Sequence, residues 1–325
     1  MRIVFFGSPA AALPSLEGLL HAGHDIPLVV TQPDRPAGRG RRLTPCAVKA
    51  FARERGIPSF EPERIRKDPT AVERLRETGA ALHVVVAYGQ IMPEPVINLP
   101  PHRSLNVHFS LLPKYRGASP VAWAILNNES STGITIFRLN ERMDEGDIFS
   151  SVETPIRSDD TAGSLEARLA VLGAELLVKT IGQLSVIVPR IQNHALATPA
   201  PKLKKDSGLV DWSQKAAAID RHVRAMNPWP TAYTFFGGER LILHEGHPLA
   251  PEAPASGGVP GTVLETSAAG IRLSCGEGTE YLLTRLQAEG RNPLEAAVFI
   301  RGGRLAPAAV LQARRGDSTE NHSWK

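Results

Sequence analysis

Four apolar runs in the first third of the chain constrain its fold more than any other feature. They are rich in β-branched and aromatic residues: "RIVFFG" at 2–7, "IPLVVTQ" at 26–32, "ALHVVVAYG" at 81–89 and "SLNVHF" at 104–109. Stretches with helical features separate them, and this alternation is typical of parallel α/β sheets. Because the runs are almost wholly apolar, both faces of the expected sheet must be covered. The sequence therefore predicts one sheet with helices on both sides.

Turn and capping residues indicate where the helices of this domain begin. Ser8 and Pro9 follow the first run directly, so we expect them to supply the N-cap and the first helical position. Further helices are expected at about 44–55, 69–77 and 161–182, and from Ser119 and Pro120 onward. The runs at 132–140 and 146–156 predict a closing pair of strands. Together these elements predict a Rossmann-like, doubly wound, mostly parallel sheet.

The composition changes after the last of these helices. The stretch "PRIQNHALATPAPKLKKDSG" is rich in Pro, Ala and Lys without a sustained period, which is typical of a linker. Beyond it, short apolar runs alternate with glycine turns and predict a second, smaller β-barrel or sandwich domain. We predict a first domain over 1–190, a linker over 191–206, the second domain over 207–314 and a disordered tail over 315–325.

Cysteine usage and hydropathy indicate the cellular setting. Cys46 and Cys275 are the two cysteines among 325 residues, too few for a disulfide framework or a CxxC metal knuckle, which fits a reducing compartment. The apolar run at the start ends at Gly7, too early for a signal sequence, and no segment reaches the length of a membrane span. We expect a cytoplasmic protein with no membrane contact and no metal.

Positive charge is concentrated in one part of the first domain. The net charge is only +4, yet residues 35–55 contain seven basic side chains against one acid, Glu54. A solvated surface face would explain such a run. However, "DRPAGRGRRLTP" spaces its arginines with Gly and Pro, as a mobile loop would, and such a loop could wrap around phosphates.

A polar pair interrupts the fourth apolar run. Asn106 and His108 are two residues apart and so share one face of the expected strand, whereas Leu105, Val107 and Phe109 face the other way. The pair lies at the carboxyl end of a strand, where parallel α/β sheets bind ligands. A histidine on a strand is more often a structural residue. The position of His108 beside Asn106 at this end of the strand favours a functional role instead.

The segment "RMDEGDI" adds Asp144 and Asp147 around a glycine turn, and for Asp147 we expect only a turn role. No GxGxxG or GxxxxGK[ST] motif follows the first strand, so dinucleotide binding has weak support.

The residue types of the polar pair favour one class of chemistry. These motifs contain no candidate Ser or Cys nucleophile, which points to transfer of an acyl group to an external nucleophile. An amine that attacks a carbonyl carbon creates a tetrahedral oxyanion, and the Asn106 amide and a His108 imidazolium would donate hydrogen bonds to it. A carboxylate such as Asp144 beside the imidazole would orient the ring and help to move the proton released by the amine.

Several segments carry a family resemblance. With "VVAYGQIMP", the segments "NVHFSLLPKYRGASP" and "TGITIFRLNERMDEGDI" resemble the catalytic core of the 10-formyltetrahydrofolate-dependent formyltransferases. The family's Asn-x-His strand and downstream Asp match Asn106, His108 and Asp144. The segments "FFGSPAAALPSLEGLL", "TQPDRPAGRGRRLTPCAVKAFA" and "HVRAMNPWPTAY" are similar to the branch that formylates methionine on initiator tRNA, and the likeness extends to about residue 305. Departures from the family pattern are Phe109, where a small residue is usual, and "MDEGD" in place of "LDTGD".

The resemblance implies partners and binding residues. It implies 10-formyltetrahydrofolate as formyl donor, initiator Met-tRNA as acceptor and an OB-like second domain. We also expect a monomer. The residues implied to contact the folate are Ser110, Leu111, Leu112 and Pro113, with the backbone of Ala87, Tyr88 and Gly89 at the pterin. The residues implied to approach the acceptor end of the tRNA are Arg35, Arg39, Arg41 and Arg42. Alternatives are a formyltransferase for a small amine acceptor and a non-catalytic RNA- or folate-binding protein.

Overall fold

The computed structural model describes residues 1–37, 42–250, 258–302 and 305–312, which fall into two units. The first unit comprises Met1–Val121, Ser130–Ile156 and Ser164–Lys202. The second comprises Ala122–Glu129, Arg157–Gly163 and Leu203–Lys325. The domain limits predicted from composition remain a prediction.

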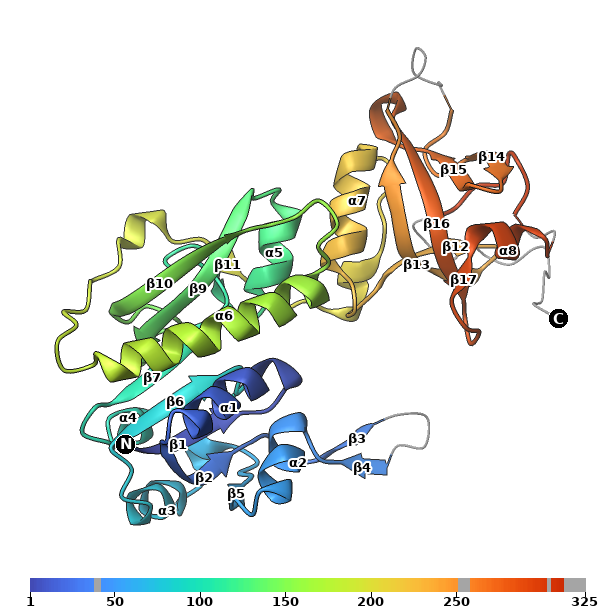
Figure 1. Cartoon of the computed structure of the whole chain (residues 1–325). Helices are drawn as coiled ribbons and strands as arrows, with labels where there is room; N and C mark the ends of the chain where they lie inside the picture. The colour runs from blue at the N-terminus through green and yellow to red at the C-terminus, as the bar shows by residue number, and fades with distance from the viewer. Residues whose placement is uncertain (38–41, 251–257, 303–304, 313–325) are drawn as a thin grey trace. The chain divides into compact units, whose positions relative to one another are not determined.

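Seven strands of the described chain form the central sheet of the first unit, in the order β10-β9-β7-β6-β1-β2-β5 (Figure 1). They are β1 (Arg2–Gly7), β2 (Asp25–Val30), β5 (Ser59–Phe60), β6 (Leu82–Val86), β7 (Ser104–His108), β9 (Ser131–Arg138) and β10 (Ile148–Pro155). The strands from β7 to β5 pair in parallel, whereas β9 and β10 are antiparallel. The helices along these residues are α1 (Leu13–His21), α2 (Ala47–Glu54), α3 (Ala71–Glu77), α4 (Glu94–Ile97) and α6 (Ala162–Gly182), while most of α5 (Pro120–Leu126) belongs to the second unit. The predicted Rossmann-like sheet is confirmed, and its predicted closing pair of strands is antiparallel.

The strand order reverses between β1 and β6. From β1 the chain proceeds outward through β2 to β5, and it then returns to the other side of β1 for β6 and β7. Doubly wound sheets bind ligands outside the carboxyl ends of their strands at such a switch point. Here Ser8 follows β1 and Ala87 follows β6, so both lie at that position.

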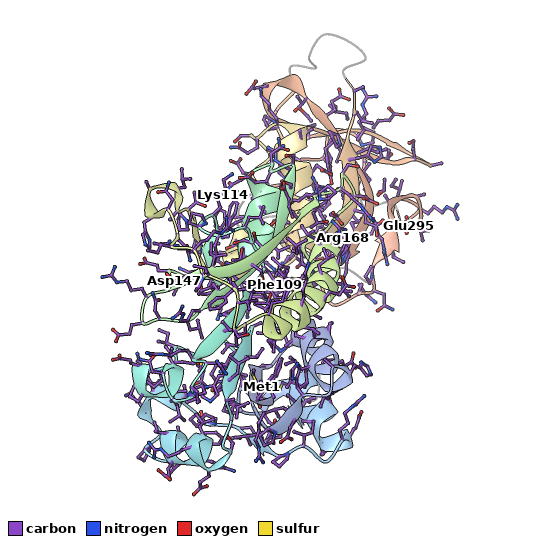
Figure 2. All side chains as sticks on the ribbon, turned by 60° about the vertical axis from the view of Figure 1, so that its left-hand side comes forward. Met1, Phe109, Lys114, Asp147, Arg168 and Glu295 are labelled. Atoms are coloured by element: carbon purple, nitrogen blue, oxygen red, sulfur yellow. The ribbon has the colours of Figure 1, made fainter. Side chains whose placement is uncertain are left out.

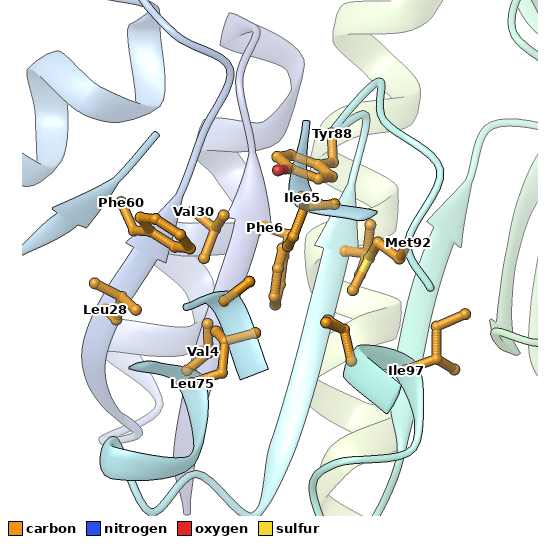
Figure 3. Packing of buried hydrophobic residues seen from close by; sticks show 13 residues of the cluster. Val4, Phe6, Leu28, Val30, Phe60, Ile65, Leu75, Tyr88, Met92 and Ile97 are labelled. Atoms are coloured by element: carbon orange, nitrogen blue, oxygen red, sulfur yellow. The ribbon is translucent and has the colours of Figure 1, made fainter. Parts of the chain in front are cut away.

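Apolar side chains cover both faces of this sheet. On one face, Phe6 and Tyr88 meet edge to face with ring centroids 5.5 Å apart, inside the cluster shown in Figure 3. On the other face, Val107 points toward α6, where a Cβ added to Gly173 would lie 3.0 Å from its Cγ1. The glycine therefore lets the helix approach the sheet closely, and the four strands formed by the apolar runs, β1, β2, β6 and β7, are buried over most of their length as their composition predicts.

Two local predictions need correction. Ser8 does not cap the first helix: α1 begins at Leu13 after a short 3-10 turn, and the Ser8 hydroxyl instead accepts a hydrogen bond from the backbone N–H of Gln32 at 2.9 Å. The ends of the basic stretch, 35–37 and 42–44, are strands where a loop was expected. Its described ends form an antiparallel hairpin of β3 (Arg35–Ala37) and β4 (Arg42–Thr44).

The second unit contains an antiparallel sheet of six described strands, in the order β12-β13-β16-β15-β14, with β17 paired to β16. These are β12 (Ala232–Phe236), β13 (Glu239–Pro248), β14 (Val263–Ser267), β15 (Gly270–Ser274), β16 (Glu280–Ala288) and β17 (Leu294–Glu295), with helices α7 (Ala216–Ala225) and α8 (Ala296–Ile300). Residues 308–312 pair with both edge strands, through Val263 at one end and Phe235 at the other. This segment closes the sheet into a barrel, in agreement with the predicted OB-like domain.

Candidate active site

Asn106 and His108 lie on one face at the carboxyl end of β7. Their partners across the sheet are Phe137 and Thr135 of β9, while Val107 faces α6 on the opposite side. This is the alternation that the sequence predicts. The Asn106 side chain is partly exposed, and within the described residues its amide makes no hydrogen bond. The amide is therefore available to a ligand.

The His108 imidazole is buried between two hydrogen-bond acceptors. Its Nε2 lies 2.9 Å from the carbonyl oxygen of Tyr115, and its Nδ1 lies 3.8 Å from Oδ2 of Asp144. The ring meets Phe137 edge-on, with centroids 6.2 Å apart. Because a carbonyl oxygen only accepts hydrogen bonds, Nε2 carries a proton in this arrangement. The distance to Asp144 is longer than a hydrogen bond, and a movement of about 1 Å would form one.

Asp144 reaches the histidine from the loop between β9 and β10. Its backbone lies in the left-handed region, with φ of 53°, which aspartate tolerates better than most residues. Its Oδ2 accepts a hydrogen bond from the backbone N–H of Gly117 at 2.8 Å, and the side chain is 13% exposed. The carboxylate is thus held between an amide and the imidazole. Asp147 pairs with Arg138 at 3.6 Å on the same hairpin.

The turn after β7 is held by its own polar groups. The Ser110 hydroxyl donates to the carbonyl of Lys114 at 2.7 Å. Thr135 of β9 donates to the carbonyl of Ser110 at 2.7 Å and accepts from the backbone N–H of Leu112 at 3.1 Å. Figure 2 marks Phe109, directly after β7, together with Lys114 of this turn and Asp147 of the Asp144 loop. The turn is therefore fixed relative to the sheet.

The apolar residues of this turn differ in exposure. Leu112 is buried against Phe137 of β9, and a cis peptide bond joins it to Pro113. Leu111 is partly exposed and lies over Gly133, where an added Cβ would come within 2.6 Å of its Cδ2. Of the residues predicted to contact the folate, Leu111 thus offers an exposed side chain, whereas Ser110 and Leu112 stabilise the turn.

A pocket of ≈ 470 Å³ opens at the switch point between β1 and β6, a size that suits a small ligand. It is lined by Ser8, Gln32, Pro33, Arg35, Thr44, Pro45, Cys46, Ala87, Tyr88, Gly89 and Lys202. The Gln32 amide donates to the carbonyl of Tyr88 at 3.0 Å and accepts from Arg35 at 3.2 Å. The pocket thus brings together two sets of predicted contacts: the backbone of Ala87, Tyr88 and Gly89, predicted to contact the pterin, and Arg35, predicted to contact RNA.

Tyr88 contributes its backbone to this pocket, because its ring belongs to the core. The side chain is 2% exposed and, within the described residues, its hydroxyl has no hydrogen-bond partner. Burial raises the pKa of this phenol above its ordinary value. The neighbouring residues Ala87 and Gly89 have φ of 47° and 77°, so the chain bends sharply on either side of the tyrosine.

The base of the basic hairpin is held by an ion triad. Lys49 of α2 lies 2.8 Å from Oδ2 of Asp34 and 2.8 Å from Oε2 of Glu61. Hydrogen bonds to Asp34 and then to Glu61 raise the pKa of this lysine. Its charge is balanced within the protein, so it adds little to the positive surface predicted from composition. Of the arginines predicted for RNA, Arg39 and Arg41 lie outside the described residues, as does the side chain of Arg42.

Two residues that sequence reasoning does not identify, Gln192 and Thr198, touch the loops of the site. Gln192 is 4% exposed and donates from Nε2 to the carbonyl of Asp144 at 2.9 Å. The Thr198 hydroxyl accepts from the backbone N–H of Tyr115 at 2.9 Å. Both residues lie in the stretch with the composition of a linker, and no periodic signal there could identify them.

Clusters of metal ligands and membrane-spanning helices are both absent over the described ranges. Within residues 1–37, 42–250, 258–302 and 305–312, no three His, Cys, Asp or Glu side chains are grouped as metal ligands would be. In the same ranges, no helix has both the length and the apolar character needed to cross a membrane.

Comparison with known proteins assigns the chain to a family. Residues 1–181 match the model of the formyl transferase domain, and residues 202–304 match the formyl transferase C-terminal domain. A methionyl-tRNA formyltransferase of Solibacter usitatus is 46% identical over 307 residues, which cover 94% of this chain and 96% of that protein. The methionyl-tRNA formyltransferase of Stutzerimonas stutzeri is 44% identical over 315 residues, 96% of this chain and 98% of that protein. This chain belongs to the methionyl-tRNA formyltransferase family.

Solved structures show the same fold at lower sequence identity. HypX from Aquifex aeolicus in complex with tetrahydrofolic acid superposes with a TM-score of 0.64 at 18% identity. The match covers 92% of this chain and 47% of HypX, so the chain spans about half of that protein's length. WlaRD, a sugar 3N-formyl transferase, superposes with a TM-score of 0.62 at 19% identity over 90% of this chain and 99% of its own. The family resemblance and the fold predicted from the sequence are both confirmed, whereas the roles of the individual site residues remain predictions.

Proposed function

We propose that this chain transfers the formyl group of 10-formyltetrahydrofolate to the α-amino group of methionine on initiator tRNA. Its family consists of formyltransferases, and its relatives at 46% and 44% identity are named for methionyl-tRNA. The observation that carries the reaction is the approach of the His108 imidazole to the Asp144 carboxylate at 3.8 Å, on the strand face shared with Asn106, whose amide makes no hydrogen bond among the described residues. Folate ligands in the HypX and WlaRD structures support a folate-type donor.

The proposed step is attack of the methionine amine on the formyl carbon. The new C–N bond turns the formyl oxygen into an oxyanion, and the amide of Asn106 and the imidazole of His108 donate hydrogen bonds to it. One such donor contributes about 2.7–4 kcal/mol to the stability of the transition state. The bond between the formyl carbon and N10 of the folate then breaks, the amine loses a proton, and N10 gains one.

His108 and Asp144 have separate tasks in this step. The carboxylate lies 3.8 Å from Nδ1 and orients the ring toward the oxyanion. It is also an acceptor for the proton that leaves the amine. In the structure, Nε2 donates to the carbonyl of Tyr115. To donate to the substrate oxygen, His108 must therefore release this carbonyl or share the Nε2 proton between the two oxygens. Catalytic hydrogen bonds commonly tighten only once substrates are bound.

The surroundings suit two different substrates. On the donor side, the partly exposed Leu111 and the backbone at Ala87 and Gly89 provide an apolar wall and polar backbone groups for a flat ring system. For the acceptor, Arg35 and Lys202 bring positive charge to the same pocket that Ala87 and Gly89 line, which suits the phosphates of an RNA end. The barrel of the second unit has an architecture common among nucleic-acid-binding domains.

A formyl-transfer assay tests this proposal directly. Purified protein is mixed with 10-formyltetrahydrofolate and one of four acceptors: charged initiator tRNA, Met-charged elongator tRNA, glycinamide ribonucleotide or a nucleotide-linked amino sugar. We expect kcat/KM to be highest for the initiator tRNA. Comparable transfer to a small amine, or none to the initiator tRNA, would reject the proposal. His108→Ala protein prepared in parallel excludes a contaminating enzyme.

A further inference from the structure

We propose that residues 190–200, here called the strap, position the catalytic pair His108 and Asp144, and that Gln192 and Thr198 are positioning residues for formyl transfer. This inference rests on the proposed function. The strap follows α6 and has the composition of a linker, yet it forms hydrogen bonds with the loops on both sides of the site.

On the Asp144 side, Gln192 fixes the loop through its side chain. Its Nε2 donates to the carbonyl of Asp144 at 2.9 Å and to that of Gly146 at 2.7 Å. Its Oε1 accepts from Nε and Nη2 of Arg116 at 3.2 and 2.7 Å. The side chain is 4% exposed and its amide is fully engaged. One glutamine thus joins the Asp144 loop to the turn after β7.

The neighbouring contacts extend this attachment. Arg190 exchanges two backbone hydrogen bonds with Ile148, both 2.8 Å, so the strap runs beside the start of β10. Arg116 also pairs with Glu145 at 3.2 Å. A change at Gln192 would therefore remove one partner of Arg116 and release the Asp144 backbone at the same time.

On the His108 side, Thr198 and the residues after it hold the turn. The Thr198 hydroxyl and carbonyl accept from the backbone N–H groups of Tyr115 and Arg116, both at 2.9 Å. Strand β11 (Pro199–Ala200) then pairs with β8 (Arg116–Gly117). The turn in this position presents the Tyr115 carbonyl to His108 and the Gly117 N–H to Asp144.

The backbone of these loops explains why such support is needed. Tyr115, Gly117 and Asp144 have φ of 60°, 127° and 53°, conformations that non-glycine residues rarely adopt. Such conformations persist when the surrounding structure holds them. Tyr115 contacts His108, Gly117 contacts the Asp144 carboxylate, and the strap bonds directly to Tyr115 and Asp144. We infer that the strap sets the separation between the imidazole and the carboxylate.

Two matched pairs of variants test this inference. Thr198→Val removes the hydroxyl acceptor, and Thr198→Ser restores it. Gln192→Leu removes both the donor and the acceptor, and Gln183→Leu makes the same change at an exposed glutamine just after α6. Steady-state kinetics with 10-formyltetrahydrofolate and charged initiator tRNA give kcat and each KM. Hydrogen–deuterium exchange of peptides covering 113–118 and 140–148 reports on the loops independently of activity.

For Gln192→Leu and Thr198→Val we expect kcat to fall by about tenfold to a hundredfold with both KM values nearly unchanged, since misplacement of catalytic groups by about 1 Å has effects of this size. Exchange should rise in the two peptides, and Thr198→Ser and Gln183→Leu should match the parent protein. Unchanged kcat and exchange, or equal losses in Thr198→Ser and Thr198→Val, would overturn the inference.

The outcome for the strap can be separated from that for the proposed function. If the parent protein does not formylate charged initiator tRNA, the proposed function is rejected. In that case the exchange data still decide whether the strap holds the loops. If the parent protein is active and the variants keep its kcat, only the role of the strap is rejected. If Gln192→Leu fails to fold, Gln192→Glu replaces it: the carboxylate still accepts from Arg116, the donor to the carbonyls of Asp144 and Gly146 is lost and a negative charge faces them, so the same expectation holds.

Discussion

Asn106→Ala is expected to slow formyl transfer by about a hundredfold to a thousandfold while leaving the fold almost unchanged. The first part follows from the loss of one hydrogen-bond donor to the oxyanion, about 2.7–4 kcal/mol. The second part follows from the surroundings of the amide. Within the described residues the side chain has no hydrogen-bond partner, so its removal leaves no buried group unpaired. The free energy of unfolding should change by no more than about 0.5 kcal/mol.

The measurement pairs a rate with a stability. Single-turnover transfer from 10-formyltetrahydrofolate to charged initiator tRNA, with enzyme in excess, isolates the chemical step from product release. Urea unfolding of the same samples gives the free energy of unfolding. Asn98→Ala is the matched control, because Asn98 is exposed and, among the residues that the structure describes, its amide donates to Glu94 alone, at 3.1 Å. The control should change neither the rate nor the stability by a measurable amount.

A second substitution tests the direction of the hydrogen bond. Asn106→Asp keeps the shape of the side chain and replaces the donor with a negatively charged acceptor. Its rate should be at least as low as that of Asn106→Ala, since a carboxylate repels the oxyanion. A loss of less than about tenfold in Asn106→Ala would refute the proposed role of the amide. A parallel loss of rate and stability would show that the residue is structural.

Three further changes have defined outcomes. His108→Ala should lower kcat by at least about a hundredfold with little loss of tRNA affinity, because its hydrogen bond forms mainly in the transition state; equal losses would indicate a binding role. Joint replacement of Arg39, Arg41 and Arg42 by Ala should weaken tRNA binding and reduce its dependence on salt concentration. If the salt dependence is unchanged, these arginines form only a solvated surface. Burial lowers the pKa of His83 from 6.5 to about 4. Between pH 6.5 and about 4, the unfolded chain therefore binds a proton at His83 that the folded chain does not bind. The free energy of unfolding should fall by roughly 3 kcal/mol as the pH drops through this range. Urea unfolding at several pH values should show this loss in the parent protein and a smaller one in His83→Leu; equal losses would contradict it.

Much of the sheet and half of the site could be predicted from the sequence. The alternation of side chains along a strand has a fixed period, so the sequence alone places Asn106 and His108 on one face. The position of Asp144 is different. It reaches His108 from a loop 36 positions further on, and only the family resemblance connects the two residues. Its distance to the imidazole depends on backbone conformations that no local pattern encodes.

The errors and omissions have physical causes. Ser8 has the side chain of a good N-cap, but the N–H of Gln32, which follows the neighbouring strand, takes its hydroxyl instead. The hairpin of β3 and β4 escapes prediction because its Gly and Pro content resembles a loop. Gln192 escapes it because a residue with three long-range partners leaves no trace in periodicity or composition. Long-range contacts decide the cases of Ser8 and Gln192.

The closure of the barrel by residues 308–312 makes a short segment near the end of the chain important to the whole second unit. Hydrogen bonds that join Gln312 to Phe235, and Ala308 and Ala309 to Val263, satisfy both outer strands at once. A nonsense codon just before this segment would remove a small part of the protein and yet leave two unprotected β edges, which invite pairing between molecules. Loss of so short a piece would therefore cause aggregation rather than a small local defect.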